Sequence, residues 1–155
     1  NRIIKRCDAI EQVKEALKSF EKEKLISWGD ETKFKAMLDL VDVKNGVVID
    51  VKTTRDGNQR EFVSQLLALK YDIQMHHYCK AINGNAAYVI AIESDTAEVA
   101  LYDITDIVFS DFTKNRYGKA LEIALEVMKM ETCPPKFKPE IINLNLPKWA
   151  VEETA

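Results

Sequence analysis

The stretch FKAMLDLVDVKNGVVIDVKTT, residues 34–54, decides the fold. Apolar and polar residues alternate in residues 34–42 and again in residues 47–53, which is the period of a half-buried strand. Asn45-Gly46 lies between the two runs and favours a tight hairpin turn, because both residues tolerate a positive φ angle. On the first predicted strand, one face is expected to hold Phe34, Ala36, Leu38 and Leu40.

Three charged side chains of this predicted hairpin are candidates for chemistry. Asp50 and Lys52 are two residues apart on the second strand and should leave the same face, and Asp39 could lie opposite them. Spacing alone leaves two interpretations open. In the first, these charges are solvated, and a cross-strand ion pair contributes at most about 1 kcal/mol to stability. In the second, they form a metal site beside a lysine, because burying two apposed carboxylates without a cation costs free energy.

The composition limits which classes of protein this chain can belong to. The 155 residues suffice for one domain, and 46% hydrophobic and 30% charged residues are ordinary for a soluble globular protein. No apolar run approaches membrane-spanning length, and the chain starts abruptly at Asn1, as a fragment would. The net charge of −3 argues against nucleic-acid binding by the whole surface. Three scattered cysteines, Cys7, Cys79 and Cys133, indicate neither zinc nor disulfides and favour a reducing cytoplasm.

The rest of the chain predicts helices and strands around the hairpin. Amphipathic spacing predicts helices over residues 8–22 and 105–131, and one or two abutting helices over residues 59–82. Asn115–Gly118 weakens the expected continuity of the last helix. Strands are predicted over residues 24–28, 86–93 and 98–104, and an irregular tail over residues 132–155. This order predicts an α/β domain over residues 1–155, with a central mixed sheet flanked by helices.

The predicted helix after the hairpin adds polar groups to one face. Tyr71, Gln74 and Tyr78 stand at i, i+3 and i+7 and therefore share a face. A tyrosine at helical spacing usually packs in a core, and this is the interpretation of Tyr71. Gln74 is an unusual packing residue because its amide needs hydrogen-bond partners, which a functional site would supply.

These residues together resemble a known family. The set Asp39, Asp50-Val51-Lys52-Thr53 and Gln74-x-x-x-Tyr78 resembles the PD-(D/E)XK nuclease superfamily, with its restriction-endonuclease-like core. More narrowly it is similar to the RecE-like (exonuclease VIII) and RecB-type exonuclease domains. Glu23, ahead of the first motif strand, is a further candidate ligand. That branch usually has a metal-binding histidine upstream of the first aspartate, and residues 1–38 contain none, so an N-terminal helical part is expected to be missing.

The resemblance implies a role for each motif residue. Asp39, Asp50 and the Val51 backbone carbonyl would hold Mg²⁺ or Mn²⁺. Lys52 would orient the attacking water or neutralise charge on the phosphate. Gln74 and Tyr78 would steady the water, the lysine or the DNA backbone. Thr53 would bond a phosphate.

The resemblance also implies a function, a metal-dependent exonuclease that degrades duplex DNA from 5′ to 3′ in phage-type recombination. A ring-like homo-oligomer around DNA and a single-strand annealing protein as partner are expected, and no membrane association. Two alternatives stay open. The same core could serve a structure-specific or restriction-type endonuclease, which would also cut closed circular DNA. It could also serve a DNA-binding module without catalysis, which would not need the intact Asp39, Asp50 and Lys52.

Overall fold

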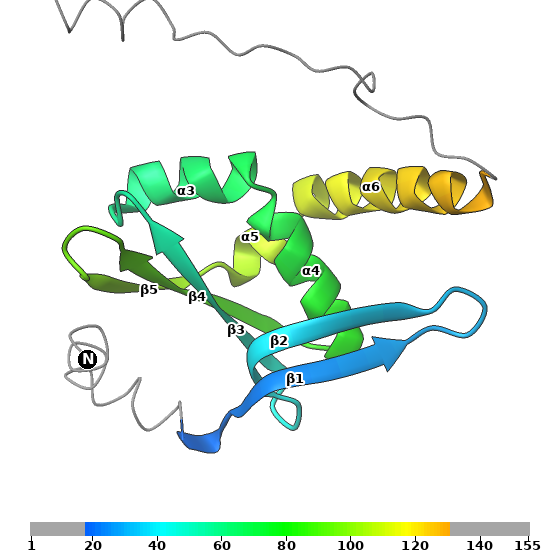
Figure 1. Cartoon of the computed structure of the whole chain (residues 1–155), viewed down its shortest axis with the longest axis horizontal. Coiled ribbons are helices and arrows are strands. Elements are labelled where there is room, and N and C mark those ends of the chain that lie inside the picture. The colour runs from blue at the N-terminus through cyan, green and yellow to red at the C-terminus, as the bar shows by residue number, and fades with distance from the viewer. Residues whose placement is uncertain (1–17, 131–155) are drawn as a thin grey trace, which may run out of the picture. The chain divides into compact units, whose positions relative to one another are not determined.

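The computed structural model describes residues 18–130. This part of the chain holds five strands and four helices. Figure 1 shows how they are arranged. The strands are β1 (Glu21–Trp28), β2 (Phe34–Asp42), β3 (Val47–Thr54), β4 (Ala86–Glu93) and β5 (Val99–Asp103). The helices are α3 (Gln59–Ala68), α4 (Tyr71–Ile82), α5 (Thr105–Phe109) and α6 (Asp111–Lys129). Most of the predicted helix over residues 8–22 and the whole tail over residues 132–155 lie outside the described residues.

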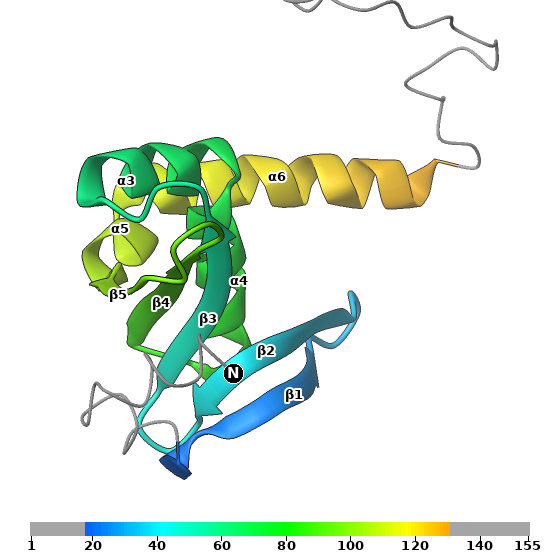
Figure 2. The same ribbon diagram turned by 60° about the vertical axis from the view of Figure 1, so that its left-hand side comes forward.

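The strands form one mixed sheet in the order β1-β2-β3-β4-β5 (Figures 1 and 2). Strand β2 pairs antiparallel with both β1 and β3. Helices α3 and α4 connect β3 to β4, which pairs parallel with β3, and β5 pairs antiparallel with β4. This confirms the predicted α/β core with a central mixed sheet. The sheet lies in the first of two compact units, Asn1–Glu122, and of the second unit, Ile123–Ala155, only the end of α6 is described.

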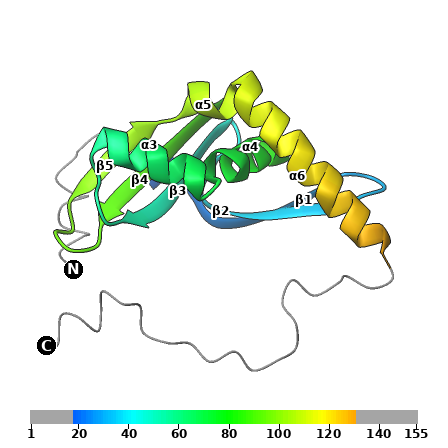
Figure 3. The same cartoon turned by 90° about the horizontal axis from the view of Figure 1, so that it is seen from above.

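Helices α3, α4 and α5 cover one face of the sheet (Figure 3). The main core lies between them and this face, because the alternating strand residues that point there are apolar. It holds Ala36, Leu38, Val41, Val48, Ala87, Val89 and Ala91 from the strands and Phe62, Leu66, Met75, Cys79, Ile104 and Val108 from the helical side. A smaller cluster on the opposite face is built on Leu40, Ile49 and Ile90.

Some predicted boundaries were wrong. Strand β1 begins at Glu21, so residues 21–22 belong to a strand and not to the predicted helix over 8–22. The helical residues after β5 are divided at Ser110, and the suspected break at Asn115–Gly118 is continuous helix. Ser110 has an extended backbone, and its hydroxyl donates to the Ile107 carbonyl and accepts from the Thr113 N–H, which ends one helix and caps the next.

The turn between β2 and β3 differs from the two-residue type that Asn-Gly favours. Of its residues, Gly46 alone has a positive φ of 70°, and the Gly46 N–H donates to the Val43 carbonyl at 3.4 Å. The Asp42 carboxylate accepts from both the backbone N–H and the side-chain amide of Asn45. These bonds hold a four-residue turn, so Asn45 contributes through its side chain rather than through a left-handed backbone.

The predicted face of β2 is wrong in its second half. Ala36 and Leu38 pack in the main core, but Leu40 joins the opposite cluster and Val41 returns to the main core. The alternation therefore shifts by one residue at Asp39. Glu23, which stands opposite Asp39 in the register of β1 and β2, has a left-handed backbone with φ 49°. A distortion of this kind in an antiparallel pair re-aims side chains and is common beside functional sites.

Candidate active site

Strands β2 and β3 separate beside Asp39. The two strands pair only from Leu40↔Ile49 to Asp42↔Val47, and Figures 1 and 2 show β2 turning away from β3 beyond these pairs. The Val51 N–H thus lacks a β2 backbone partner and donates instead to Asp39 Oδ2 at 2.9 Å. Because the N–H and C=O of a strand residue point to the same side, the Val51 carbonyl is directed toward this gap as well.

Asp50 and Lys52 leave β3 on the helix-covered face, as the alternation predicts. Asp50 is 2% exposed, and its Oδ2 lies 2.7 Å from Lys52 Nζ without a well-angled hydrogen bond. Burial raises the pKa of the Asp50 carboxyl above its ordinary value, the Lys52 ammonium lowers it, and the neighbouring Asp39 carboxylate raises it again. Asp39 Oδ2 bonds to the N–H of Val51, the residue after Asp50, so the two carboxylates are neighbours, and one lysine offsets only one of their two negative charges.

Helix α4 supplies further residues of the site, in addition to those of β2 and β3. Lys52 Nζ donates to Gln74 Oε1 at 2.9 Å, and Gln74 Nε2 donates to the Tyr78 hydroxyl at 2.7 Å. The Lys52 ammonium also lies 4.5 Å from the centre of the Tyr71 ring. Since Gln74 uses its amide nitrogen on Tyr78, its carbonyl oxygen is the end presented to the lysine. Five of the predicted site residues are thus brought together: Asp39, Asp50, Lys52, Gln74 and Tyr78.

A carboxylate pair on two separating strands, with a lysine two residues after the second carboxylate, is the arrangement that the motif predicted. The family described as "PDDEXK-like domain of unknown function (DUF3799)" matches residues 1–139. The chain belongs to this family. The predicted membership of the PD-(D/E)XK superfamily is thereby confirmed, and the protein has a PDDEXK-like nuclease fold. No curated protein matches the sequence.

Solved structures with a TM-score of 0.50 or more share the fold of this PDDEXK-like domain. A candidate exonuclease from Eubacterium rectale has a TM-score of 0.62 at 14% identity, over 96% of this chain and 62% of the other. The chain thus spans less than two thirds of the length of that protein. SSO0001 has a TM-score of 0.50 at 19% identity, over 84% of this chain and 67% of its own. A phage-related exonuclease from Haemophilus somnus 129PT has a TM-score of 0.47 at 16% identity, over 83% and 74%.

The PDDEXK-like site fits a hard divalent cation. The buried Asp50 Oδ2 has no hydrogen bond, and two adjacent carboxylates with one lysine leave a net negative charge beneath the strand gap. Carboxylate and carbonyl oxygens are the ligands that Mg²⁺ and Mn²⁺ prefer. Within residues 18–130, however, no group of three or more histidine, cysteine or acidic side chains gathers around one point.

Two other candidates lie outside this cluster. Thr53 is exposed and alternates with Lys52, so it points to the opposite face of β3 and is not brought to the carboxylates. Glu23 is also exposed and does not complete a set of three acidic ligands. It lines a hollow of about 490 Å³ together with Lys22, Asp39, Leu40 and Val51. Glu23 therefore stands beside the site, at the edge of the strand gap.

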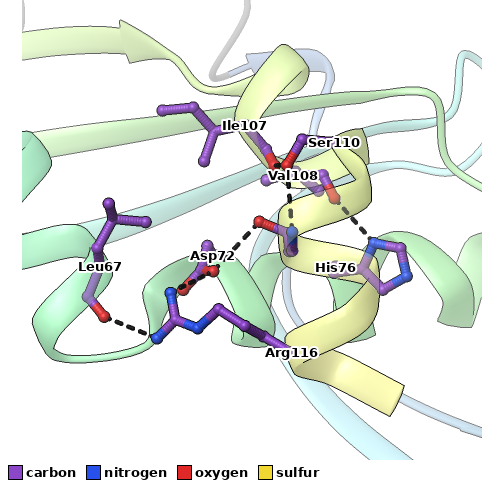
Figure 4. A network of polar contacts seen from close by, with 8 residues as sticks. Leu67, Asp72, His76, Ile107, Val108, Ser110 and Arg116 are labelled. Carbon is purple, nitrogen blue, oxygen red and sulfur yellow. Dashed lines mark hydrogen bonds and ion pairs between the residues drawn. The ribbon is translucent and has the colours of Figure 1, made fainter. Parts of the chain in front are cut away.

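Sequence reasoning missed a buried clamp behind the site, shown in Figure 4. Asp72 is fully buried, and its Oδ2 accepts from Arg116 Nη1 at 2.8 Å and from the Thr113 hydroxyl at 3.2 Å. Arg116 Nη2 also donates to the Leu67 carbonyl at 2.9 Å. Between Leu67 and Asp72 the chain leaves α3 and starts α4 through Lys70, whose φ is 61°. The guanidinium therefore ties together the end of one helix and the start of the next.

No local pattern could have revealed this clamp, since Arg116 and Asp72 are 44 residues apart in the sequence. The two histidines, His76 and His77, are buried or half-buried. His76 is buried and its Nδ1 donates to the Val108 carbonyl at 2.9 Å, as Figure 4 shows. His77 is half-buried against Trp28, and burial lowers the pKa of its imidazole. Both therefore pack the helix against its neighbours.

No helix within residues 18–130 is long and apolar enough to cross a membrane.

Proposed function

We propose that the protein is a metal-dependent exonuclease that hydrolyses phosphodiester bonds of duplex DNA. The observation that carries this proposal is a set of contacts at one place: Asp39 accepts from the Val51 N–H, and Asp50 pairs with Lys52, which bonds to Gln74 and through it to Tyr78. A solvated hairpin surface would not bury an aspartate and its lysine partner, because burying charges without a use for them costs free energy. Membership of a PDDEXK-like family supports nuclease chemistry on DNA.

Asp39, Asp50 and the Val51 carbonyl are the residues that would hold Mg²⁺ or Mn²⁺. Asp39 comes from β2, and Asp50 and Val51 come from β3, beside the place where the two strands separate. Asp50 Oδ2 has Lys52 as its ion-pair partner but accepts no hydrogen bond, which supports a cation there. When bound, such an ion would polarise the scissile phosphate and make a coordinated water more acidic.

Lys52 is proposed to act on the reacting phosphate. Its ammonium has three N–H donors, of which one is directed to Gln74 and another faces Asp50. The third donor can orient an attacking water or bond a phosphate oxygen as negative charge develops on it. Gln74 fixes the direction of the ammonium, and Tyr78 fixes the orientation of Gln74.

The finer parts of the function are supported by the sequence resemblance. It is the reason to propose 5′ to 3′ degradation in phage-type recombination, a ring-like homo-oligomer, a single-strand annealing partner and a cytoplasmic location. The name of the Eubacterium rectale structure is a further reason to test exonuclease activity first. The position of Thr53 lends no support to its proposed phosphate contact, because its side chain leaves the face opposite Lys52.

The test compares linear with closed circular duplex DNA in the presence of Mg²⁺. We expect the full-length protein to release nucleotides from linear DNA alone, and Asp50→Asn or Lys52→Met to abolish this release. Asp95→Asn, which removes an exposed carboxylate in the turn after β4, is the matched control and should cleave normally. Cleavage of closed circles would establish an endonuclease instead, and full activity in Asp50→Asn would refute the site.

One observation favours a second candidate, a DNA-binding module without catalysis. The described residues supply two carboxylates but no third acidic, histidine or cysteine ligand. Calorimetric titration with Mg²⁺ and Mn²⁺ separates the two functions, since the exonuclease must bind metal and Asp50→Asn must weaken that binding. DNA binding without metal binding in the full-length protein would favour the module.

A further inference from the structure

Tyr71 is the first residue of α4, and its ring lies against the ammonium of Lys52, with 4.5 Å between Nζ and the ring centre. Within about 6 Å, an ammonium is attracted to the negative face of an aromatic ring. We propose that Tyr71 is a positioning residue that holds Lys52 in its working place, an inference that rests on the nuclease function proposed above. Tyr71 would act through Lys52 and would not touch the DNA.

Lys52 needs such support because its side chain is long and flexible. A lysine ends in a point charge on a four-carbon stem, and a small misplacement of a catalytic group is costly to the rate. The Lys52 side chain is 16% exposed and has three neighbours: Asp50, Gln74 and the Tyr71 ring. Any other cation that Asp50 binds would weaken the attraction of Asp50 for the lysine. The ring and the Gln74 carbonyl have no such competitor.

The ring, and not the hydroxyl, is the part of Tyr71 that makes this contact. Within residues 18–130 the Tyr71 hydroxyl has no hydrogen-bond partner, whereas the Tyr78 hydroxyl accepts from Gln74. A phenylalanine at position 71 would keep the aromatic face, and a leucine or methionine would keep the apolar volume without it. Substitution at this one position can therefore separate the attraction of the ring from simple packing.

The position of the ring is itself fixed by the fold. Tyr71 is half-buried and packs against the main core, and it follows Lys70, whose left-handed backbone (φ 61°) starts α4 in a new direction. The next residue, Asp72, is held by Arg116 from α6. The clamp of Figure 4 thus sets where the first turn of α4 begins, and with it the place of the ring beneath the lysine.

The experiment measures kcat and KM of the full-length protein on linear duplex DNA with Mg²⁺, for Tyr71→Phe, Tyr71→Leu and Tyr71→Met. We expect Tyr71→Phe to match the wild type. Tyr71→Leu and Tyr71→Met should lose roughly fivefold to a hundredfold in kcat while KM stays within about twofold. Tyr88→Leu is the matched control, because this half-buried tyrosine of β4 packs on the opposite face of the sheet. It should keep the wild-type kcat.

A second measurement needs no activity. Urea unfolding of single and double variants tests whether Tyr71→Leu costs less stability when position 52 is methionine than when it is lysine, as direct coupling requires. Unchanged kcat in both the Leu and Met variants would overturn the proposal, and so would an equal loss in Tyr71→Phe. An inactive wild type would refute the nuclease function, and the unfolding cycle would still decide whether the ring holds Lys52.

Discussion

Removal of the Arg116 guanidinium tests how the helices behind the site are held. Arg116→Ala leaves the fully buried Asp72 without its ion-pair partner and leaves the Leu67 carbonyl without its donor. Loss of one partner of a buried ion pair costs about 3–5 kcal/mol. The Arg116 side chain is 25% exposed, so water can reach part of the site, and we expect the lower value of about 3 kcal/mol.

The expected change is large enough to measure by thermal unfolding. For a chain of 155 residues, each kcal/mol shifts the melting temperature by roughly 2–4 °C, so Arg116→Ala should lower it by about 6–12 °C. Lys114→Ala on the same helix is the control. It removes an exposed ion pair with Asp111 at a distance of 3.5 Å and should change the free energy of unfolding by less than about 1 kcal/mol.

A second substitution, Asp72→Asn, makes the test sharper, because its effect on stability should have opposite signs in two backgrounds. Asp72→Asn should destabilise the wild type, because it removes the charge that Arg116 pairs with. In the Arg116→Ala background the same change should raise stability, because it removes an unpaired buried charge. If Arg116→Ala melts within about 2 °C of the wild type, or if Asp72→Asn destabilises both backgrounds equally, the clamp does not stabilise this junction.

Two further predictions concern single residues. Cys79 is 1% exposed and burial raises the pKa of its thiol to about 12, so thiol reagents at neutral pH should modify it only after unfolding, as peptide mapping would show. Because the folded state holds this proton more tightly, the stability advantage of the wild type over Cys79→Ala should be complete below about pH 9 and should shrink above it; an advantage that grows with pH would contradict this. Asn58 caps α3 by accepting from the N–H groups of Arg60 and Glu61, so Asn58→Ala should cost about 1 kcal/mol in urea unfolding. Gln59→Ala, an exposed neighbour, should be near neutral, and equal losses would argue against the cap.

Much of the fold could be predicted because strands and helices each have a characteristic spacing of apolar residues along the sequence. The second hairpin strand, β4 and the paired helices after the hairpin follow directly from alternation and amphipathic spacing. The prediction failed where a strand distortion or a local capping bond changed the periodic pattern. Leu40 faces the smaller core cluster because β2 shifts its alternation at Asp39, opposite the left-handed Glu23. The last helix begins anew after Ser110 because that hydroxyl supplies a cap.

The sequence by itself determined which residues could carry chemistry, because the identities and spacing of Asp39, Asp50, Lys52, Gln74 and Tyr78 are local facts. Only the tertiary structure decided how they meet. The separation of β2 from β3 frees the Val51 N–H for Asp39, and the crossover through α3 and α4 places Gln74 and the Tyr71 ring on Lys52. Thr53, next to Lys52 in the sequence, points to the other face of the sheet. The physical reason is that hydrogen bonds and ion pairs depend on distances in space, which residues far apart in the chain acquire only through packing.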